Sequence, residues 1–330
     1  MAKLRLTLAC GNYDRTRALL DGTVQVEGVD LTYIPLGPEE TFWRMEHYEE
    51  FDASEMSMGA YTVMRGRGED RFIAIPVFPS RMFRHNGIYV NADAGIERPE
   101  DLKGRRVGVA EYNATAAVWM RGLLQHEYGV HPSDVRWYQG GLHDPGRKEK
   151  AMGKLMPGVS IEPVPEGRSL NEMLVAGELD ALAVPRMPNA FAQRSPRVRR
   201  LFPNFREVEQ DYYRRTGIFP VMHSIVLRRD VYEANRWLAE SLYKALVRAK
   251  EVCVADLYHA QALAYMLPWL LDEIEQTRGL MGDDYWAYGL EPNRRTLEAF
   301  MQYAHEQGLT PERIPMESLF APPTLEEFKI

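Results

Sequence analysis

The sequence passes from one apolar run to the next through FPSRMFRHNGIYVN, residues 78–91. Residues 73–78 are rich in β-forming side chains, and we expect Pro79 to end that strand before a second one starts at Gly87. The predicted turn between them carries three basic side chains: Arg81, Arg84 and His85. Arginine forks match carboxylates, and histidine can transfer a proton near neutral pH. The stretch is typical of a site for a small acid, although each residue alone could be an ordinary surface or turn residue.

Composition limits the class of protein. At 330 residues the chain exceeds one ordinary domain, which predicts two lobes. The net charge of −7 argues against a nucleic-acid partner, because nucleic-acid-binding surfaces are basic. No apolar run is long enough to cross a bilayer, and the short stretch before Cys10 contains Arg5, unlike a secretory signal. We therefore expect a cytoplasmic protein with no membrane partner.

Strand and helix patterns alternate along the chain. Predicted strands at residues 4–9, 29–34 and 51–57 are each followed by a helical pattern, which favours a mostly parallel sheet covered by helices. A second such series starts near residue 101. In it, Ser169 and Glu172 predict a capping box and Gly177 a helix end. Later helices are predicted at residues 237–257, 260–271 and 297–307.

This organisation resembles the type II periplasmic-binding-protein fold, an α/β fold of two lobes with a ligand cleft between them. We predict that residues 1–90 form the first part of lobe 1 and residues 91–222 form lobe 2. Residues 223–330 would then provide the return crossover and the C-terminal helices that complete lobe 1. Ligands of open α/β sheets bind beyond the carboxyl ends of strands, so strand-end residues are expected to line the cleft.

Five motifs carry a closer resemblance: LACGNYDRT (8–16), FPSRMFRH (78–85), EYNATAA (111–117), GIFPVMH (217–223) and MGDD (281–284). They resemble the 4,5-dihydroxyphthalate decarboxylase family, and the similarity covers essentially the whole chain. The resemblance implies conversion of 4,5-dihydroxyphthalate to protocatechuate and CO2 without an organic cofactor. The leaving carboxylate is para to a hydroxyl, whose oxygen stabilises the cation formed when the ring carbon is protonated. Such a site needs an acid, an acceptor for the phenol and a clamp for the remaining carboxylate.

The candidates for these roles fall at predicted strand ends or crossovers. His85 or His223 would deliver the proton, and Glu55 or Glu111 would accept from the catechol hydroxyls. The substrate-binding candidates are arginines for the carboxylate and polar residues for orientation: Arg81, Arg84, Arg186, Asn12, Ser57, Tyr112, Asn113 and Thr115. Alternatives remain open, because Glu55 could simply pair with an arginine and His223 could be a hydrogen-bonded core or hinge residue.

Other chemistries have little support in the sequence. We assign no metal ligands, since no His-x-x-x-His spacing occurs, although ligands gathered from distant loops stay open. We interpret Cys10 as a packed small residue rather than a nucleophile. The competing class is a cytoplasmic solute-binding or sensor protein for a small aromatic carboxylate, and a biosynthetic enzyme similar to the thiamine-precursor proteins of this fold also remains open. Several proton-transfer groups on one site would favour an enzyme. A homo-oligomer is left open.

Overall fold

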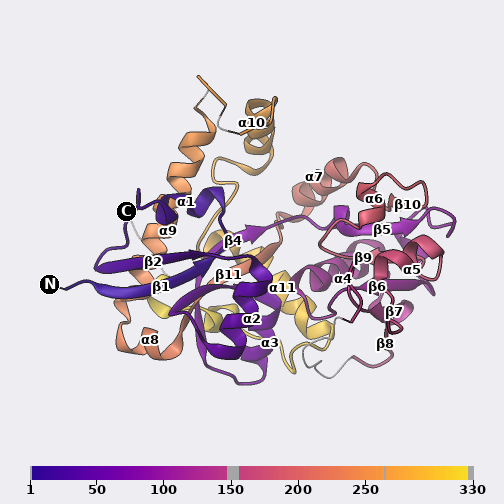
Figure 1. The fold of residues 1–330 in the computed structure, drawn as a ribbon, viewed down its shortest axis with the longest axis horizontal. Coiled ribbons are helices and arrows are strands. Elements are labelled where there is room, and N and C mark those ends of the chain that lie inside the picture. The colour runs from indigo at the N-terminus through magenta and orange to yellow at the C-terminus, as the bar shows by residue number, and fades with distance from the viewer. Residues whose placement is uncertain (1, 147–155, 260, 264, 326–330) are drawn as a thin grey trace. The chain divides into compact units, whose positions relative to one another are not determined.

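The computed structural model describes residues 2–146, 156–259, 261–263 and 265–325. These residues form two compact α/β units, each with its own sheet (Figure 1). The first unit comprises residues up to 81, residues 221–297 and the chain from 315 onwards. The second comprises residues 82–220 and 298–314.

The sheet of the first unit, within the described residues, has the strand order β2-β1-β3-β11-β4. Its strands are β1 (Leu4–Cys10), β2 (Val29–Pro35), β3 (Ala53–Ser57), β4 (Phe72–Arg81) and β11 (Val221–Arg228). β1 runs parallel to β2 and β3, whereas β11 runs antiparallel to β3 and β4. β4 carries the chain out of this unit and β11 brings it back, so these neighbours run in opposite directions. The sheet is therefore mixed rather than mostly parallel as predicted.

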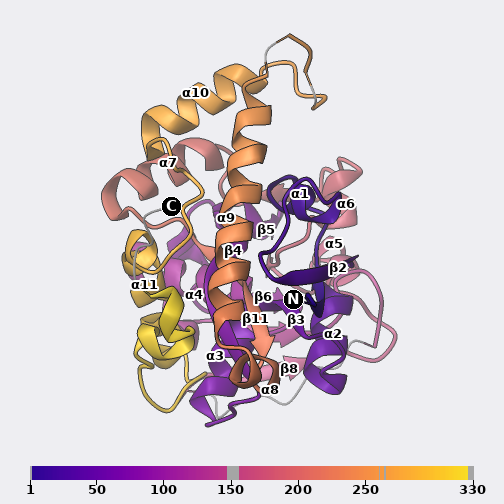
Figure 2. The ribbon, with the colours of Figure 1, turned by 90° about the vertical axis from the view of Figure 1, so that its left-hand side faces the viewer.

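Helices cover this sheet. They are α1 (Arg17–Leu20), α2 (Pro38–Tyr48), α3 (Met58–Gly66), α8 (Arg229–Ala234) and α9 (Trp237–Leu257), and α10 (Leu270–Met281) contacts α9. The long helix α9, which passes in front of β4 in Figure 2, contacts both β4 and α1. The prediction of a helix at residues 260–271 is wrong for the described residues before Leu270, because the regular helix starts only at Leu270. Pro268 accounts for this, because proline disfavours helical conformation in the residue before it. Residues 260 and 264 of that prediction lie outside the described residues.

Pro79 does not end its strand, contrary to expectation. β4 continues to Arg81, and its pairing with β11 shifts register between Val221 and Ile225. β4 lies at the edge of the sheet, where a missing backbone N–H costs little. Carbonyls of β4 instead accept hydrogen bonds from outside the sheet, with Phe78 O receiving one from Trp286 Nε1 at 3.0 Å.

The second unit has, in the part of the chain that is described, the strand order β10-β5-β9-β6-β7-β8. Its strands are β5 (Ile88–Asn91), β6 (Arg106–Val109), β7 (Arg136–Gln139), β8 (Ile161–Pro163), β9 (Ala181–Ala183) and β10 (Val198–Arg200). Its helices are α4 (Thr115–Tyr128), α5 (Leu170–Ala176), α6 (Asn189–Ala192) and α7 (Phe205–Thr216).

Two predicted lobe boundaries need correction. Residues 82–90 belong to the second unit, because β5 pairs with β9 and β10. Residues 298–314 belong there too, although we expected residues 223–330 to complete the first lobe. The reason is packing: α11 (Arg294–Glu306) brings Phe300 and Tyr303 to within 5.4 and 5.6 Å, ring centroid to centroid, of the buried Trp119.

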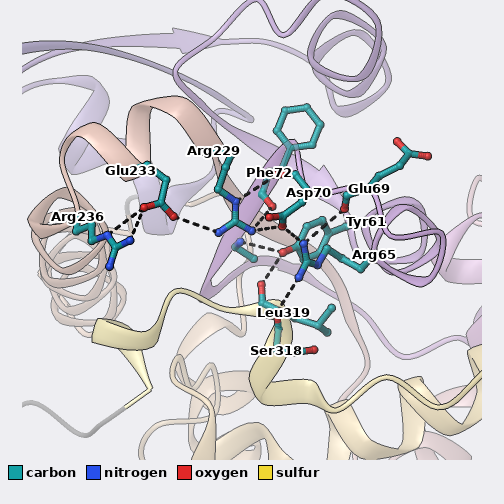
Figure 3. Close-up of polar contacts among 11 residues, drawn as sticks. Tyr61, Arg65, Glu69, Asp70, Phe72, Arg229, Glu233, Arg236, Ser318 and Leu319 are labelled. Carbon is teal, nitrogen blue, oxygen red and sulfur yellow. Dashed lines mark hydrogen bonds and ion pairs between the residues drawn. The ribbon is translucent and has the colours of Figure 1, made fainter.

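A polar network ties α3, β4, α8 and the C-terminal segment of the first unit together (Figure 3). Asp70 pairs with both Arg65 and Arg229. The buried Tyr61 hydroxyl donates to Leu319 O at 2.6 Å and accepts from Ala74 N at 3.2 Å. One hydroxyl thus satisfies two backbone groups that would otherwise be buried without a partner.

Replacing Tyr61 with phenylalanine is expected to lower the free energy of unfolding by about 1–3 kcal/mol, because it leaves those two backbone groups unsatisfied. Urea unfolding measures the change. Tyr48→Phe is the matched control, since Tyr48 is 68% exposed. Equal effects of the two substitutions would contradict the role given to Tyr61.

Candidate active site

A buried glutamate organises the polar site of the first unit. Glu55 lies on β3, between β1 and β11, and its side chain is fully buried. Its Oε1 accepts from the Tyr13 hydroxyl at 2.8 Å and lies 2.5 Å from His223 Nδ1. Its Oε2 accepts from Gly11 N at 3.0 Å and from Cys10 Sγ at 3.6 Å. All these contacts lie within one unit.

Strand register explains why these groups meet. In the antiparallel pairing of β3 with β11, Glu55 lies opposite Ile225, which makes His223 its diagonal neighbour on the same face. On the other side, β1 runs parallel to β3 and ends at Cys10, so Gly11 and Tyr13 follow directly beyond its carboxyl end. The site is therefore built on three adjacent strands rather than on one loop.

The electrostatics keep Glu55 ionised. Burial acts to raise its pKa, but the opposing charge of His223 and the hydrogen bonds from His223, Gly11 and Tyr13 hold the pKa below its usual 4.5. Burial and the nearby Glu55 raise the pKa of the Cys10 thiol well above its usual value. Burial and Glu55 likewise raise the pKa of Tyr13. Both groups stay protonated near neutral pH and donate to the carboxylate, and Cys10 is a packed thiol as predicted.

His223, like Tyr13, is partly exposed to solvent. Its side chain is 18% exposed, and the ring of Phe42 packs edge-on with centroids 4.9 Å apart. Nδ1 faces Glu55, whereas Nε2 has no hydrogen bond to any residue in the described ranges. A buried carboxylate that orients an imidazole is an arrangement suited to proton transfer.

The depressed pKa of Glu55 predicts a pH dependence of stability. Around and below pH 4.5 the unfolded chain binds more protons at this group than the folded chain does. The stability contributed by ionised Glu55 is therefore present above that pH and is lost as the pH falls through the folded-state pKa. Urea unfolding between about pH 6 and pH 3 should show a smaller loss for Glu55→Gln than for the unmodified protein. Parallel losses would rule out this contribution.

His85 lies in the predicted segment between β4 and β5, but it is buried there. It is 1% exposed in the second unit, and the rings of Phe202, Tyr212 and Tyr128 surround it. Burial, assisted by the charge of Arg215, lowers its pKa to about 4. Its imidazole is therefore neutral at pH 7, with Nδ1 3.9 Å from Glu209 Oε1. A proton donor at this position would have to act from the neutral form.

The other predicted residues of the first unit lie in varied surroundings. Ser57 caps α3, accepting from Ala60 N at 3.4 Å, and lies opposite His223 in the strand pairing. Arg81 is buried and donates from Nη1 to Ala287 O at 3.1 Å. Asn12 is exposed just beyond β1. Of the predicted residues, the structure brings Glu55, His223 and Ser57 together in this unit.

The second unit contains the remaining predicted residues. Tyr112 is buried, and the guanidinium of Arg121 lies 3.5 Å from its ring centroid. Burial lowers the pKa of Arg84 to about 10, against the opposing influence of Glu209. Thr115 is the buried first residue of α4. Glu111 and Asn113 are half-buried, and Arg186 is exposed.

Tyr13 is a site residue that the sequence analysis did not select. Its hydroxyl contact with Glu55 spans 42 positions of the chain, and no local pattern indicates such a contact. The available signal was its position beyond the end of the first strand, the same criterion that selected Asn12.

Within the described residues, no group of three or more His, Cys, Asp or Glu side chains is arranged to hold a metal ion. No helix in those ranges has both the length and the apolar character needed to span a membrane.

Comparison with known proteins gives one relative that matches over the full chain and a second that matches over 65% of it. A protein named 4,5-dihydroxyphthalate decarboxylase from Comamonas testosteroni is 42% identical over 330 residues, which is 100% of both chains. A protein of the same name from Pseudomonas putida is 45% identical over 214 residues, 65% of this chain and 83% of that one. A family model described as NMT1/THI5 like matches residues 73–144.

The solved structures include the periplasmic aliphatic sulphonate binding protein SsuA from Escherichia coli. It aligns with a TM-score of 0.53 and 13% identity, covering 98% of this chain and 99% of that one. At such low identity the likeness shows the fold alone. It confirms the predicted two-lobed periplasmic-binding-protein fold.

Proposed function

We propose that this chain, which belongs to the 4,5-dihydroxyphthalate decarboxylase family, removes one carboxylate from 4,5-dihydroxyphthalate to give protocatechuate and CO2. The geometric observation that supports catalysis is the contact between the buried Glu55 carboxylate and His223 Nδ1 at 2.5 Å. Binding of a ligand carboxylate alone does not require a buried glutamate that orients a histidine. It also does not require that the Nε2 atom of this histidine stay available for a proton transfer.

In the proposed reaction His223 is the general acid. Its Nε2 proton moves to the ring carbon that bears the leaving carboxylate, and the para oxygen stabilises the resulting cation. The bond to the carboxylate then breaks, its electron pair restores the aromatic ring, and CO2 departs. One proton thus replaces one CO2 on the ring, and His223 regains its proton from solvent.

Glu55 takes a different role from the predicted one. We expected it to accept from the catechol hydroxyls, but both of its oxygens already accept hydrogen bonds within the protein and its side chain is fully buried. We assign it to orient His223 and to stabilise the imidazolium as a positioning residue. Catalysis by His85 or Glu111 remains a proposal. So does substrate binding by Arg81, Arg84, Arg186, Asn12, Ser57, Tyr112, Asn113 and Thr115.

The test is to mix purified, metal-stripped protein with 4,5-dihydroxyphthalate and to follow CO2 and the ring product together. The expected result is release of CO2 and protocatechuate in equal amounts. Binding without turnover, also after a divalent metal ion is added, would contradict the proposal and favour a solute-binding or sensor protein. A cytoplasmic location and assembly into a homo-oligomer stay predictions.

A further inference from the structure

Arg15 is an arginine that the sequence analysis did not select. It lies in a short 3-10 helix, Asp14–Thr16, directly beyond β1. Its guanidinium contacts two aromatic rings, with Cζ 4.3 Å from the ring centroid of Tyr13 and 4.4 Å from that of Trp286. Its Nε donates to Pro79 O on β4 at 2.6 Å. Two ring contacts and this hydrogen bond together restrict the orientation of the guanidinium.

The guanidinium nevertheless retains free donors. Nη1 donates to Asp14 Oδ1 at 3.0 Å, and Nη2 has no hydrogen-bond partner among the described residues. The side chain is 18% exposed, so these N–H groups can be reached from solvent. Asp14 is 31% exposed and only partly balances the charge, because an exposed ion pair is screened by water. A fixed arginine with open donors is the group that best recognises a carboxylate.

Tyr13 connects Arg15 to the proposed acid. One face of its ring packs against the Arg15 guanidinium, and its hydroxyl donates to the same Glu55 oxygen that contacts His223. A single aromatic side chain therefore separates the open donors of Arg15 from the Glu55 and His223 pair. All of these residues belong to the first unit. A small aromatic acid bound to Arg15 would therefore lie beside the proton donor.

We propose that Arg15 binds the carboxylate that remains on the ring after decarboxylation. The inference rests on the function proposed above and adds a residue that recognises the substrate. Because the same carboxylate is present in substrate and product, Arg15 should bind both, and its loss should raise KM more than it lowers kcat.

Arg15 suits this role better than the arginine predicted earlier in the same unit. Arg81 is buried, and its guanidinium already donates to a backbone carbonyl. Arg15 combines partial exposure, two aromatic neighbours and open donors on Nη2. Its contacts join residues that are 64 positions apart in the chain, so the site forms only when the fold is complete.

The experiment measures binding of two ligands by calorimetry: protocatechuate, which carries the retained carboxylate, and catechol, which lacks it. In the unmodified protein protocatechuate should bind about 10- to 100-fold more tightly, as expected for a charge-assisted contact. Arg15→Met should remove most of this difference while leaving catechol affinity within about threefold, and Arg15→Lys should restore part of it. Methionine keeps an apolar side chain that can contact Tyr13 and Trp286, which helps to preserve the fold.

Arg17→Met is the matched control, because Arg17 is exposed in the same segment. This substitution should leave the affinities for both ligands unchanged. If Arg15 had only a structural role, Arg15→Met would lower the affinities for protocatechuate and catechol equally, and that result would overturn the proposal. It would also be overturned if the unmodified protein bound protocatechuate no better than catechol or bound neither ligand. These outcomes do not depend on turnover, so a protein that shows the carboxylate preference but releases no CO2 would refute the proposed reaction and not the role of Arg15.

Discussion

Replacing His223 with glutamine is expected to lower kcat by about 10²- to 10⁴-fold, the usual contribution of a general acid. The glutamine amide can still donate to the Glu55 carboxylate, so the strand pairing around the site should persist. It cannot supply a proton to the ring carbon. KM should change little, because the substrate carboxylate is bound elsewhere. Steady-state kinetics with 4,5-dihydroxyphthalate gives both constants.

His47→Gln provides the matched control for this experiment. His47 lies on α2 of the same unit, where its ring stacks on Trp43 with centroids 3.6 Å apart and its Nδ1 contacts Trp43 O. This substitution should leave kcat unchanged. A His223→Gln protein with a native circular dichroism spectrum and an unchanged kcat would show that the proton comes from another group, and His85 would then be tested next.

Replacing Trp119 with alanine is expected to lower the free energy of unfolding by about 3–5 kcal/mol. Trp119 is 2% exposed, and its ring packs against Phe300 and Tyr303 of α11. The substitution removes a large apolar surface from the core of the second unit and leaves a cavity. Urea unfolding, followed by circular dichroism, measures the loss.

The comparison is Trp43→Ala, because Trp43 is 46% exposed in the first unit. It should change the free energy of unfolding by only about 0.5 kcal/mol. A loss below about 1 kcal/mol for Trp119→Ala would mean that the α11 contact contributes little to the second core. The assignment of residues 298–314 to that unit would then lose its energetic support.

Local signals in the sequence predict local structure well. Ser169 and Glu172 form the predicted capping box at the start of α5, and Gly177 ends that helix with a φ of 75°. Pro38 opens α2 with two acidic residues in its first turn, which are local helix-start signals. The five quoted motifs also indicate the correct family. These features depend on residues that are close together in the chain or on short motifs, which a sequence displays directly.

Long-range packing determines what the sequence could not show. His85 looked like a turn residue because the neighbours that bury it, Phe202 and Tyr212, come more than a hundred positions later. Pro79 looked like a strand end because only the completed sheet reveals that β4 is an edge strand. Glu55 and His223 were selected at strand ends, but their contact spans 168 positions and follows from the pairing of β3 with β11.

The position of β11 between β3 and β4 constrains the order in which the chain can fold during synthesis. β4 leaves the ribosome before the second unit has been made, and its sheet partner follows only afterwards: Ser224 on β11 donates to Ile75 O across 149 positions. Until then β4 is an unpaired apolar strand whose prolines, Pro76 and Pro79, remove N–H groups that a foreign strand could use. His223 is also on β11, so the proposed acid contacts Glu55 only after β11 has paired with β3 and β4 in the sheet of the first unit.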